Sequence, residues 1–225
     1  MDPLTIAAAA IDGDGTRLRR LVRQVVDEHG LVRAWTEHVR PAGRILGQRD
    51  RLDLPGAAPQ HFLDQAVLEA CRAVALRSRP AGVDADPDAN GRAPAAAEQG
   101  VEPGTPDPQG TVAQALIVAG PERLVRAHVI AAELTRRGVI TRVGQPGGEA
   151  PDEIRHFLAT ARPCVLALVG QVPGAKEIVD DAGARSDLEV YLLGRDAADV
   201  WAPHVHRVAT VSAAVDEIAA ACGTE

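Results

Sequence analysis

Histidine and aspartate side chains are the groups in this sequence that could carry acid-base or metal chemistry. His204 and His206 lie two positions apart, so in an extended segment both would face one way and form a weak metal pair. No third ligand follows nearby, and an ordinary loop is the favoured interpretation. Asp50, Asp53 and Asp64 could act as general acids or bases, but that role needs a partner and a raised pKa. We therefore predict no metal centre and no catalytic residue among them, only solvated ends of helices.

Other motifs that could carry chemistry are incomplete. The glycine-rich run at 144–148 follows an apolar segment, but its spacing and Pro151 do not match a phosphate-binding loop, so we interpret it as a flexible loop. Cys71, Cys164 and Cys222 are far apart in sequence and flanked by apolar residues. That pattern is typical of buried free thiols in a reducing compartment.

The composition excludes several classes of partner. A formal net charge of -7 disfavours binding to a phosphate backbone, and two Phe, two Trp and one Tyr supply few rings for stacking on bases. No apolar run approaches the roughly 20 residues that a membrane span requires. The start of the sequence has no basic leader. We expect a cytoplasmic protein that contacts neither nucleic acid nor membrane.

Residues 1–77 are predicted to form a four-helix bundle. Apolar residues recur there at helical spacing, as Leu18, Val22 and Val25 do, and short turns separate the segments. Pro41 lies inside the third segment, so a kink or a break is expected there. The predicted helices cover residues 4–10, 16–28, 31–47 and 57–77, with a loop at 50–55.

The chain changes character after this bundle. Residues 78–110 repeat Pro, Gly, Ala and Asp without an apolar period, which is typical of a flexible linker. Residues 111–225 alternate apolar runs with amphipathic stretches, and this rhythm predicts a flavodoxin-like, five-stranded parallel sheet with flanking helices. The expected fold class is thus α/β with an all-α cap. Strands are predicted at 115–119, 139–143, 164–169, 189–193 and 208–211, and helices at 122–137, 152–161, 175–182 and 213–222.

Short motifs in both halves resemble one known family. They are Trp35, Pro41, Gly47 and Pro151, with the runs at 12–14, 30–31, 60–62, 134–138, 143–144, 165–168 and 193–194. These motifs resemble the helical cap and the Rossmann-like cobalamin-binding domain of the CarH-type light-sensing regulators, and the related module of methionine synthase. The resemblance implies a ligand cleft between bundle and α/β domain, in a chain without the regulators' DNA-binding domain.

The position that binds cobalt in that family is altered here. The family places an acidic residue, then a histidine beneath the cobalt, and three positions later a glycine, in the loop after the first strand. Here the segment 122–127 reads ERLVRA, so the histidine position is Arg123 or Leu124 and the glycine position is Arg126 or Ala127. A guanidinium has no free lone pair for a metal, and leucine has no ligand atom. Cobalamin is therefore disfavoured, and no other cofactor is predicted.

Further positions of the family's ligand site also differ. A Ser and a Thr after the third strand become Val169 and Gln171, and the first of two glycines after the fourth strand becomes Leu193. His128, one helical turn after Leu124, could serve as a displaced metal ligand, but a partly exposed helix residue is favoured.

The cap side of the family's site differs too. Its motif, a Trp and a later Glu-His pair, is replaced by Asp50 and by Gln60 with His61. The predicted ligand-binding cleft consists of Asp50, Gln60, His61, Arg123, Leu124, Val169, Gln171 and Gly194.

These observations favour a regulatory or sensory binding module that works without cobalamin. It would respond to an unknown small molecule in the cleft or to a regulatory protein partner, and homodimer formation stays open. One alternative is a genuine cobalamin photosensor or corrinoid carrier without the axial histidine. Another is a biosynthetic or accessory enzyme that uses the remodelled cleft, and enzyme activity is the less favoured interpretation.

Overall fold

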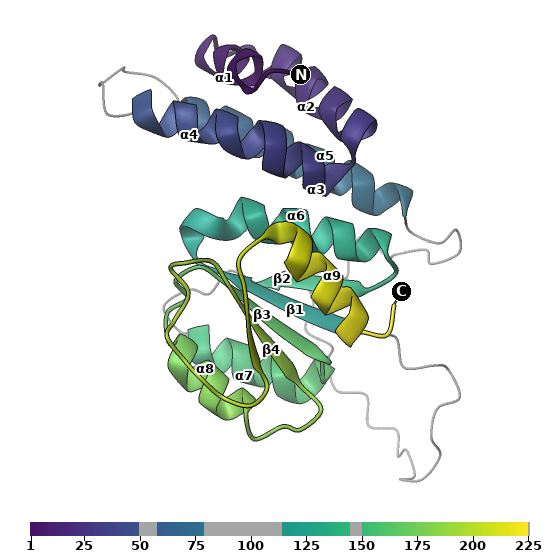
Figure 1. Ribbon diagram of the computed structural model, residues 1–225, viewed down its shortest axis with the longest axis vertical. Coiled ribbons are helices and arrows are strands. Elements are labelled where there is room, and N and C mark those ends of the chain that lie inside the picture. Colours follow the sequence, from purple (N-terminus) through teal and green to yellow (C-terminus); the bar gives the residue numbers. More distant parts are fainter. Residues whose placement is uncertain (50–57, 79–113, 145–149, 225) are drawn as a thin grey trace, which may run out of the picture.

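The computed structural model describes residues 1–49, 58–78, 114–144 and 150–224. A layer of helices lies on top of an α/β sandwich in which one sheet separates two pairs of helices (Figure 1). Asp50, Asp53 and the predicted loop at 50–55 lie outside the described residues, and so does the predicted loop at 144–148 apart from Gly144. So does the predicted linker after Ser78, and the predicted domain boundaries stay predictions.

The described residues of the first half, 1–49 and 58–78, form the predicted bundle of helices. Aspartates begin two of its helices, because Asp2 accepts a hydrogen bond from the Leu4 amide at 2.9 Å and Asp14 accepts one from Arg17 at 2.9 Å. Leu18 and Leu63 are among the side chains buried between the helices. The helices are α1 (Pro3–Ile11), α2 (Gly15–His29), α3 (Leu31–Ala34), which continues through η1 (Trp35–Val39) into α4 (Arg40–Arg49), and α5 (Pro59–Arg77).

The third helix of the bundle contains the irregularity that Pro41 predicted. Residues Trp35–Val39 form one π-helical turn, in which the Arg40 amide donates to the carbonyl of Trp35, five residues earlier. Proline has no amide hydrogen, and its ring crowds the carbonyl four residues before it, so the wider turn relieves the clash. The distortion precedes the proline, and it separates α3 from α4.

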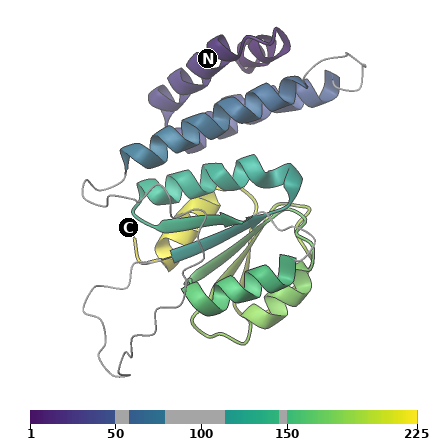
Figure 2. The same ribbon diagram turned by 180° about the vertical axis from the view of Figure 1, so that it is seen from behind.

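The second half is a five-stranded, wholly parallel sheet with the strand order β2-β1-β3-β4-β5. Helices α6 and α9 cover one face, and α7 and α8 cover the other (Figures 1 and 2). This confirms the predicted flavodoxin-like fold class with its helical cap. The elements are β1 (Gln114–Ala119), η2 (Pro121–Arg123), α6 (Leu124–Arg136), β2 (Ile140–Gly144), α7 (Ala150–Ala161), β3 (Val165–Val169), α8 (Ala175–Ala182), β4 (Glu189–Leu193), β5 (Val205–Val208) and α9 (Val211–Ala221).

The predicted position of the last strand of the sheet was wrong. The prediction put it at 208–211, but β5 is Val205–Val208, and Val211 is the first residue of α9. The Thr210 side chain accepts a hydrogen bond from the Ala213 amide at 3.1 Å and so begins the helix earlier than expected. His206 therefore lies on a strand, where it bonds Glu189 at 2.8 Å, and not in a loop.

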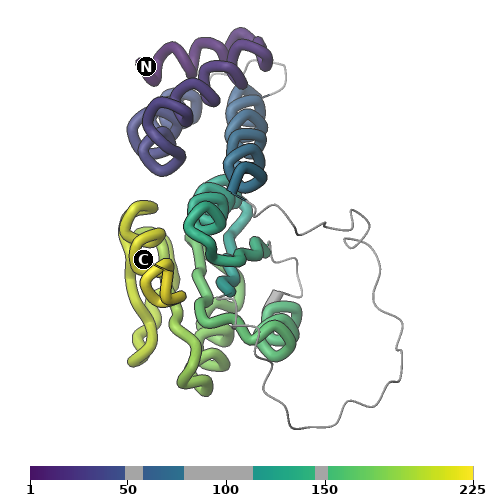
Figure 3. Tube along the Cα trace, turned by 90° about the vertical axis from the view of Figure 1, so that its right-hand side faces the viewer, coloured from purple at the N-terminus to yellow at the C-terminus, as the bar shows by residue number. Residues whose placement is uncertain are grey.

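One apolar core joins the bundle to the α/β half. A single cluster of buried side chains runs from the bundle helices through α6 and α9 to one face of the sheet, while a second cluster lies beneath α7 and α8. Helix α5 packs along α6, and Figure 3 shows the bundle stacked on that helix. In the described part of the chain, no helix combines the length and the apolar composition that crossing a bilayer would need.

The cysteines are free thiols as expected, but two of them are in contact. Cys71 is buried in α5, and burial raises its pKa to about 12. Cys164, just before β3, and Cys222, just after α9, are only half-buried, and their sulfur atoms lie 3.1 Å apart. The hydrogen bond from Cys222 lowers the pKa of Cys164 to about 6, against the opposing effect of burial, while the pKa of Cys222 is raised.

Cys164 is therefore expected to react with iodoacetamide well below the pH at which an ordinary thiol does. Peptide mass spectrometry of the reduced protein should show alkylation of Cys164 with a midpoint near the pKa of about 6, while Cys71 stays unmodified at neutral pH. Cys222→Ala removes the hydrogen-bond donor and should move that midpoint upward, whereas Cys71→Ala should leave it unchanged. Equal midpoints in the wild type and Cys222→Ala would contradict the assignment.

Candidate functional site

The site lies at the edge of the sheet where the parallel strands end. In this strand order the chain leaves β1 and β3 in opposite directions, and the carboxyl ends of those strands leave a crevice in which ligands of such folds bind. Three loops meet there, and they follow β1, β3 and β4. They contribute Gly120 and Arg123 of η2, then Gly170, and then Gly194 with Asp196.

Two glycines let these loops approach one another closely. A β-carbon at Gly120 would lie 2.2 Å from the carbonyl oxygen of Gln171, so the first loop rests on the backbone of the second. Gly170 (φ +75°) lies under the side chain of Arg123, where a β-carbon would be 2.6 Å from the Arg123 Cγ atom. Both sites admit only hydrogen, and Gly170 also needs the left-handed backbone that glycine tolerates.

The three loops form the floor of the site, and an ion pair connects two of them. The Arg123 Nε and Nη2 atoms donate to Oδ2 of Asp196 at 3.1 and 2.9 Å, which links the loop after β1 to the loop after β4. Burial alone would raise the pKa of Asp196, but the hydrogen bonds and charge of Arg123, with the charge of Arg126, lower it. The Asp196 carboxylate thus stays ionised, and it holds the guanidinium of Arg123, whose Cβ and Cγ atoms lie against Gly170.

A cleft of about 930 Å³ opens above this ion pair, between the bundle and the α/β domain. Its size is within the range of pockets that bind small organic molecules. The bundle contributes Trp35, Val39, Arg40, Gly43, Arg44, Gln60, Leu63 and Asp64, and the α/β domain contributes Pro121, Glu122, Arg123, Val125, Arg126, Gly194, Arg195, Asp196, Ala209 and Thr210.

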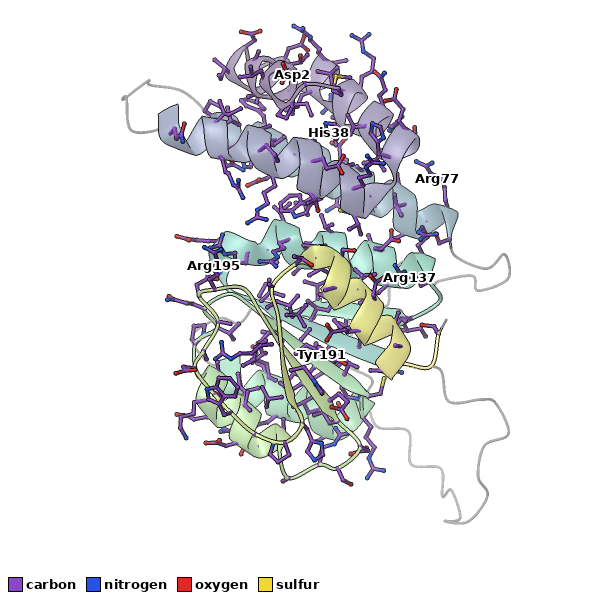
Figure 4. The ribbon with its side chains drawn as sticks, viewed as in Figure 1. Asp2, His38, Arg77, Arg137, Tyr191 and Arg195 are labelled. Atoms are coloured by element: carbon purple, nitrogen blue, oxygen red, sulfur yellow. The ribbon has the colours of Figure 1, made fainter. Side chains whose placement is uncertain are left out.

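Arginine dominates the charged lining of this cleft. Burial lowers the pKa of Arg126, and the charges of Arg40 and Arg123 lower it further. Burial also lowers the pKa of Arg40, as do the charges of Arg44, Arg123 and Arg195. Figure 4 shows Arg195 at the end of α6 opposite to Arg137, at the edge of the α/β domain below the bundle. The guanidinium groups of one wall therefore lower the pKa values of those on the other wall by charge repulsion.

One carboxylate of the cleft is held differently. Asp64 on α5 is half-buried, and burial raises its pKa, although a hydrogen bond from Gln60 at 2.7 Å and the charge of His61 act in the opposite direction. A carboxyl group with a raised pKa that faces a cleft can exchange protons with a ligand. The raised pKa that sequence could not show is thus present at one of the three aspartates.

The structure brings together some of the predicted site residues. Gln60, Arg123 and Gly194 line the cleft, and Asp50 lies outside the described residues. The other predicted residues are not part of the lining. Leu124 is half-buried at the start of α6, His61 is exposed against Phe62, Val169 is buried in the core, and Gln171 is exposed on its loop.

The histidines that were weighed as metal ligands lie elsewhere. His128 is half-buried on α6 outside the cleft lining, and burial and the charge of Arg72 lower its pKa. His206 stacks on Tyr191 with ring centroids 5.0 Å apart and bonds Glu189. Among the described residues, no group of three His, Cys, Asp or Glu side chains converges on one point.

Sequence reasoning missed most of the charged lining. Arg40 and Arg44 are spaced by four residues on one helix, and Arg195-Asp196 directly follow Gly194 at a strand end, so both signals are visible in the sequence. The partner of Arg123 is 73 positions away, and no local pattern indicates it. Trp35 was recognised as a family motif but not assigned to the cleft.

Comparisons with known proteins support the fold and no more. No protein-family model matches the chain, and neither does any curated protein. A solved structure titled "Structure of Methanosarcina barkeri monomethylamine corrinoid protein" is similar, with a TM-score of 0.59 at 11% sequence identity over 96% of this chain and 95% of that one. At this identity the likeness shows that the chain has the fold of a corrinoid-binding protein, a helical cap with a Rossmann-like domain.

The residues present do not fit a cobalamin held by an axial side chain. The loop after β1 offers Arg123, whose guanidinium is engaged by Asp196, and no imidazole lines the described part of the cleft. A protonated guanidinium cannot donate an electron pair to cobalt. The chain thus has the fold of a corrinoid protein, but the loop after β1 carries an ion pair where a metal ligand would be needed.

Gly120→Ala tests the close packing of the loops. Its methyl group would meet the backbone of Gln171 at 2.2 Å, so the loop that carries Arg123 must shift. We expect a loss of about 1–3 kcal/mol in the free energy of unfolding, the usual cost of overpacking. Gly15→Ala, at the start of α2 with nothing within 4 Å, is the matched control and should be neutral or stabilising. Urea unfolding measures both, and equal stability of the two variants would contradict the packing argument.

Proposed function

We propose that this chain is a regulatory binding module that takes a small-molecule ligand in the cleft between bundle and α/β domain, without cobalamin. The observation that carries the proposal is the Arg123–Asp196 ion pair, because Arg123 is one of the two candidates for the family's axial-histidine position and its guanidinium is held by Asp196 beside an open cleft. The fold supplies a ligand crevice at the strand ends, and its donor set suits an organic ligand better than a metal complex.

The arrangement of the two walls suits a signalling role. The bundle wall belongs to α4, η1 and α5, and the other wall belongs to the loops at the strand ends and the first turn of α6. A ligand that touches both walls stabilises one arrangement of the bundle over the α/β domain by its differential affinity for that arrangement. The exposed face of α1 and α2 would report the change to a regulatory protein partner or to a second copy of the chain.

A second candidate function is an enzyme, and Asp64 is the observation that favours it. Its pKa is raised by burial, it faces the cleft, and Gln60 orients it with a hydrogen bond of 2.7 Å. Such a carboxyl could act as a general base on a bound substrate. Product formation by the wild type in a metabolite mixture, lost in Asp64→Asn and retained in Glu69→Gln on the same helix, would favour the enzyme.

The binding module can be tested with the fluorescence of Trp35. Trp201 is 80% exposed and the chain has two tryptophans, so Trp201→Phe leaves Trp35 in the cleft as the single reporter. We expect adenosylcobalamin and hydroxocobalamin, added in the dark and after illumination, to give no bound-cobalamin spectrum and no heat of binding. At least one compound of a metabolite panel should change the Trp35 emission at saturable concentration.

Two outcomes would overturn this function. A red protein with a bound-cobalamin spectrum would establish the alternative, a cobalamin photosensor or corrinoid carrier that binds the cofactor without an axial histidine. A panel in which neither charged nor neutral metabolites affect Trp35 or the melting temperature would remove the small-molecule module.

A further inference from the structure

The charge of the cleft runs against the charge of the protein. The chain carries a formal net charge of -7, yet five arginines and three carboxylates line this one cavity. Arg40, Arg44, Arg123, Arg126 and Arg195 come from three separate segments of the sequence and meet only in the fold. An acidic protein that concentrates positive charge in a concave site raises the local concentration of anions there.

The three carboxylates of the cleft do not balance the charge of its five arginines. Asp196 is bonded to Arg123, and neither Asp64 nor Glu122 forms an ion pair with an arginine among the described residues. In the described part of the chain, no carboxylate forms an ion pair with Arg40, Arg44, Arg126 or Arg195. The cleft therefore holds a surplus of guanidinium groups with free donors.

Arg126 is the guanidinium group of the cleft whose hydrogen-bonding capacity is least satisfied. Its Nε atom is buried and has no hydrogen-bond partner among the described residues, and its Nη2 atom makes only a long contact of 3.4 Å to the Ala209 carbonyl. A buried donor of a charged group that lacks an acceptor is costly. An acceptor oxygen of a ligand in the cleft would pair with this guanidinium at its Nη1 atom, beside which Gly194 leaves room.

The two walls of the cleft repel each other. Arg40 on the bundle wall is destabilised in its charged form by Arg123 and Arg195, and Arg126 on the opposite wall by Arg40. A ligand with negative charge between the walls replaces this repulsion by attraction to both. The forked guanidinium donors match the paired oxygens of phosphate and carboxylate groups.

A second cavity in the same interface lacks these properties. It measures about 690 Å³, and Arg77 and Arg136 are part of its lining. Figure 4 shows Arg77 near the end of α6 that lies opposite to Arg195. Its arginines are paired within the protein, Arg77 with Asp27 at 3.2 Å and Arg136 with Glu133 at 2.6 Å. The surplus of positive charge therefore distinguishes the first cleft.

We infer that the cleft binds an organic anion with at least two phosphate or carboxylate groups, which bridges Arg40 and Arg44 of the bundle to Arg126 and Arg195 of the α/β domain. The inference rests on the proposed binding function and names its ligand class. Trp35, Val39, Leu63 and Val125 supply an apolar surface for the carbon part of the ligand. Binding of the anion draws the bundle onto the α/β domain, and this closure is the regulatory signal.

The probes are ATP, pyrophosphate and citrate, titrated into Trp201→Phe at constant ionic strength. Adenosine serves as the neutral control and sodium chloride as the monovalent one. We expect the multivalent anions to change the Trp35 emission at saturation and to raise the melting temperature, and the two controls to do neither. A response to ATP and pyrophosphate alone assigns a phosphate ligand, and a response to citrate alone assigns a carboxylate ligand.

Matched arginine variants separate a specific site from general attraction. The double variant Arg40→Ala/Arg44→Ala should weaken anion binding about tenfold or more, the effect of losing a charge-assisted hydrogen bond. Its melting temperature without ligand should stay equal or rise, because a repulsive pair is removed. Arg20→Ala/Arg23→Ala, on the exposed face of α2, makes the same change in net charge and should leave the affinity unchanged.

Asp64→Asn should change the affinity for the anion in the opposite direction from the arginine variants. It removes a negative charge from the cleft and should strengthen binding of the same anion at pH 7. The inference is overturned if the multivalent anions have no effect, or if the α2 double variant weakens binding as much as the cleft variant. If a neutral metabolite changes the Trp35 emission while the anions do not, the ligand class is wrong and the binding module stands.

Discussion

The ion pair between Arg123 and Asp196 is the interaction on which the organisation of the cleft depends. It joins the loops after β1 and β4 across Gly170, and the side chain of Arg123 fits there only because that position has no β-carbon. Partly exposed ion pairs contribute little to stability, about 0–1 kcal/mol. The contribution of this pair is therefore positional: it fixes one guanidinium at the floor of the cleft and keeps a charge next to Arg126.

The fold could be predicted from the sequence wherever the core dictates the residue pattern. The strands β1 and β3 are buried on both faces and read as continuous apolar runs, and α6 and α9 show helical periodicity. The strand β5 lies at the edge of the sheet and exposes His206 and Arg207, so its apolar signal is weak. A cap at Thr210 and not apolar periodicity decides where the following helix begins.

The candidate site was less predictable because charge partners are a property of the folded chain. Motif spacing correctly assigned Gln60, Arg123 and Gly194 to the cleft, and each of them lies at the end of a helix or strand. Asp196 can be recognised as a site residue only from its contact with Arg123 in the folded chain. The repulsion between Arg40 and Arg126 arises only when α4 faces the strand ends. The raised pKa of Asp64 likewise depends on burial that no local pattern reports.

The separation between core and cleft explains how a corrinoid-type fold can accommodate a different ligand chemistry. The apolar cluster that runs from the bundle through α6 determines how the two halves pack, and deleting side chains from such a core costs 2–5 kcal/mol each. Cleft residues such as Arg44 and Arg195 are exposed and contribute little to that packing. Substitutions at the cleft therefore change charge and donor type at small cost in stability, whereas substitutions in the core would change the architecture.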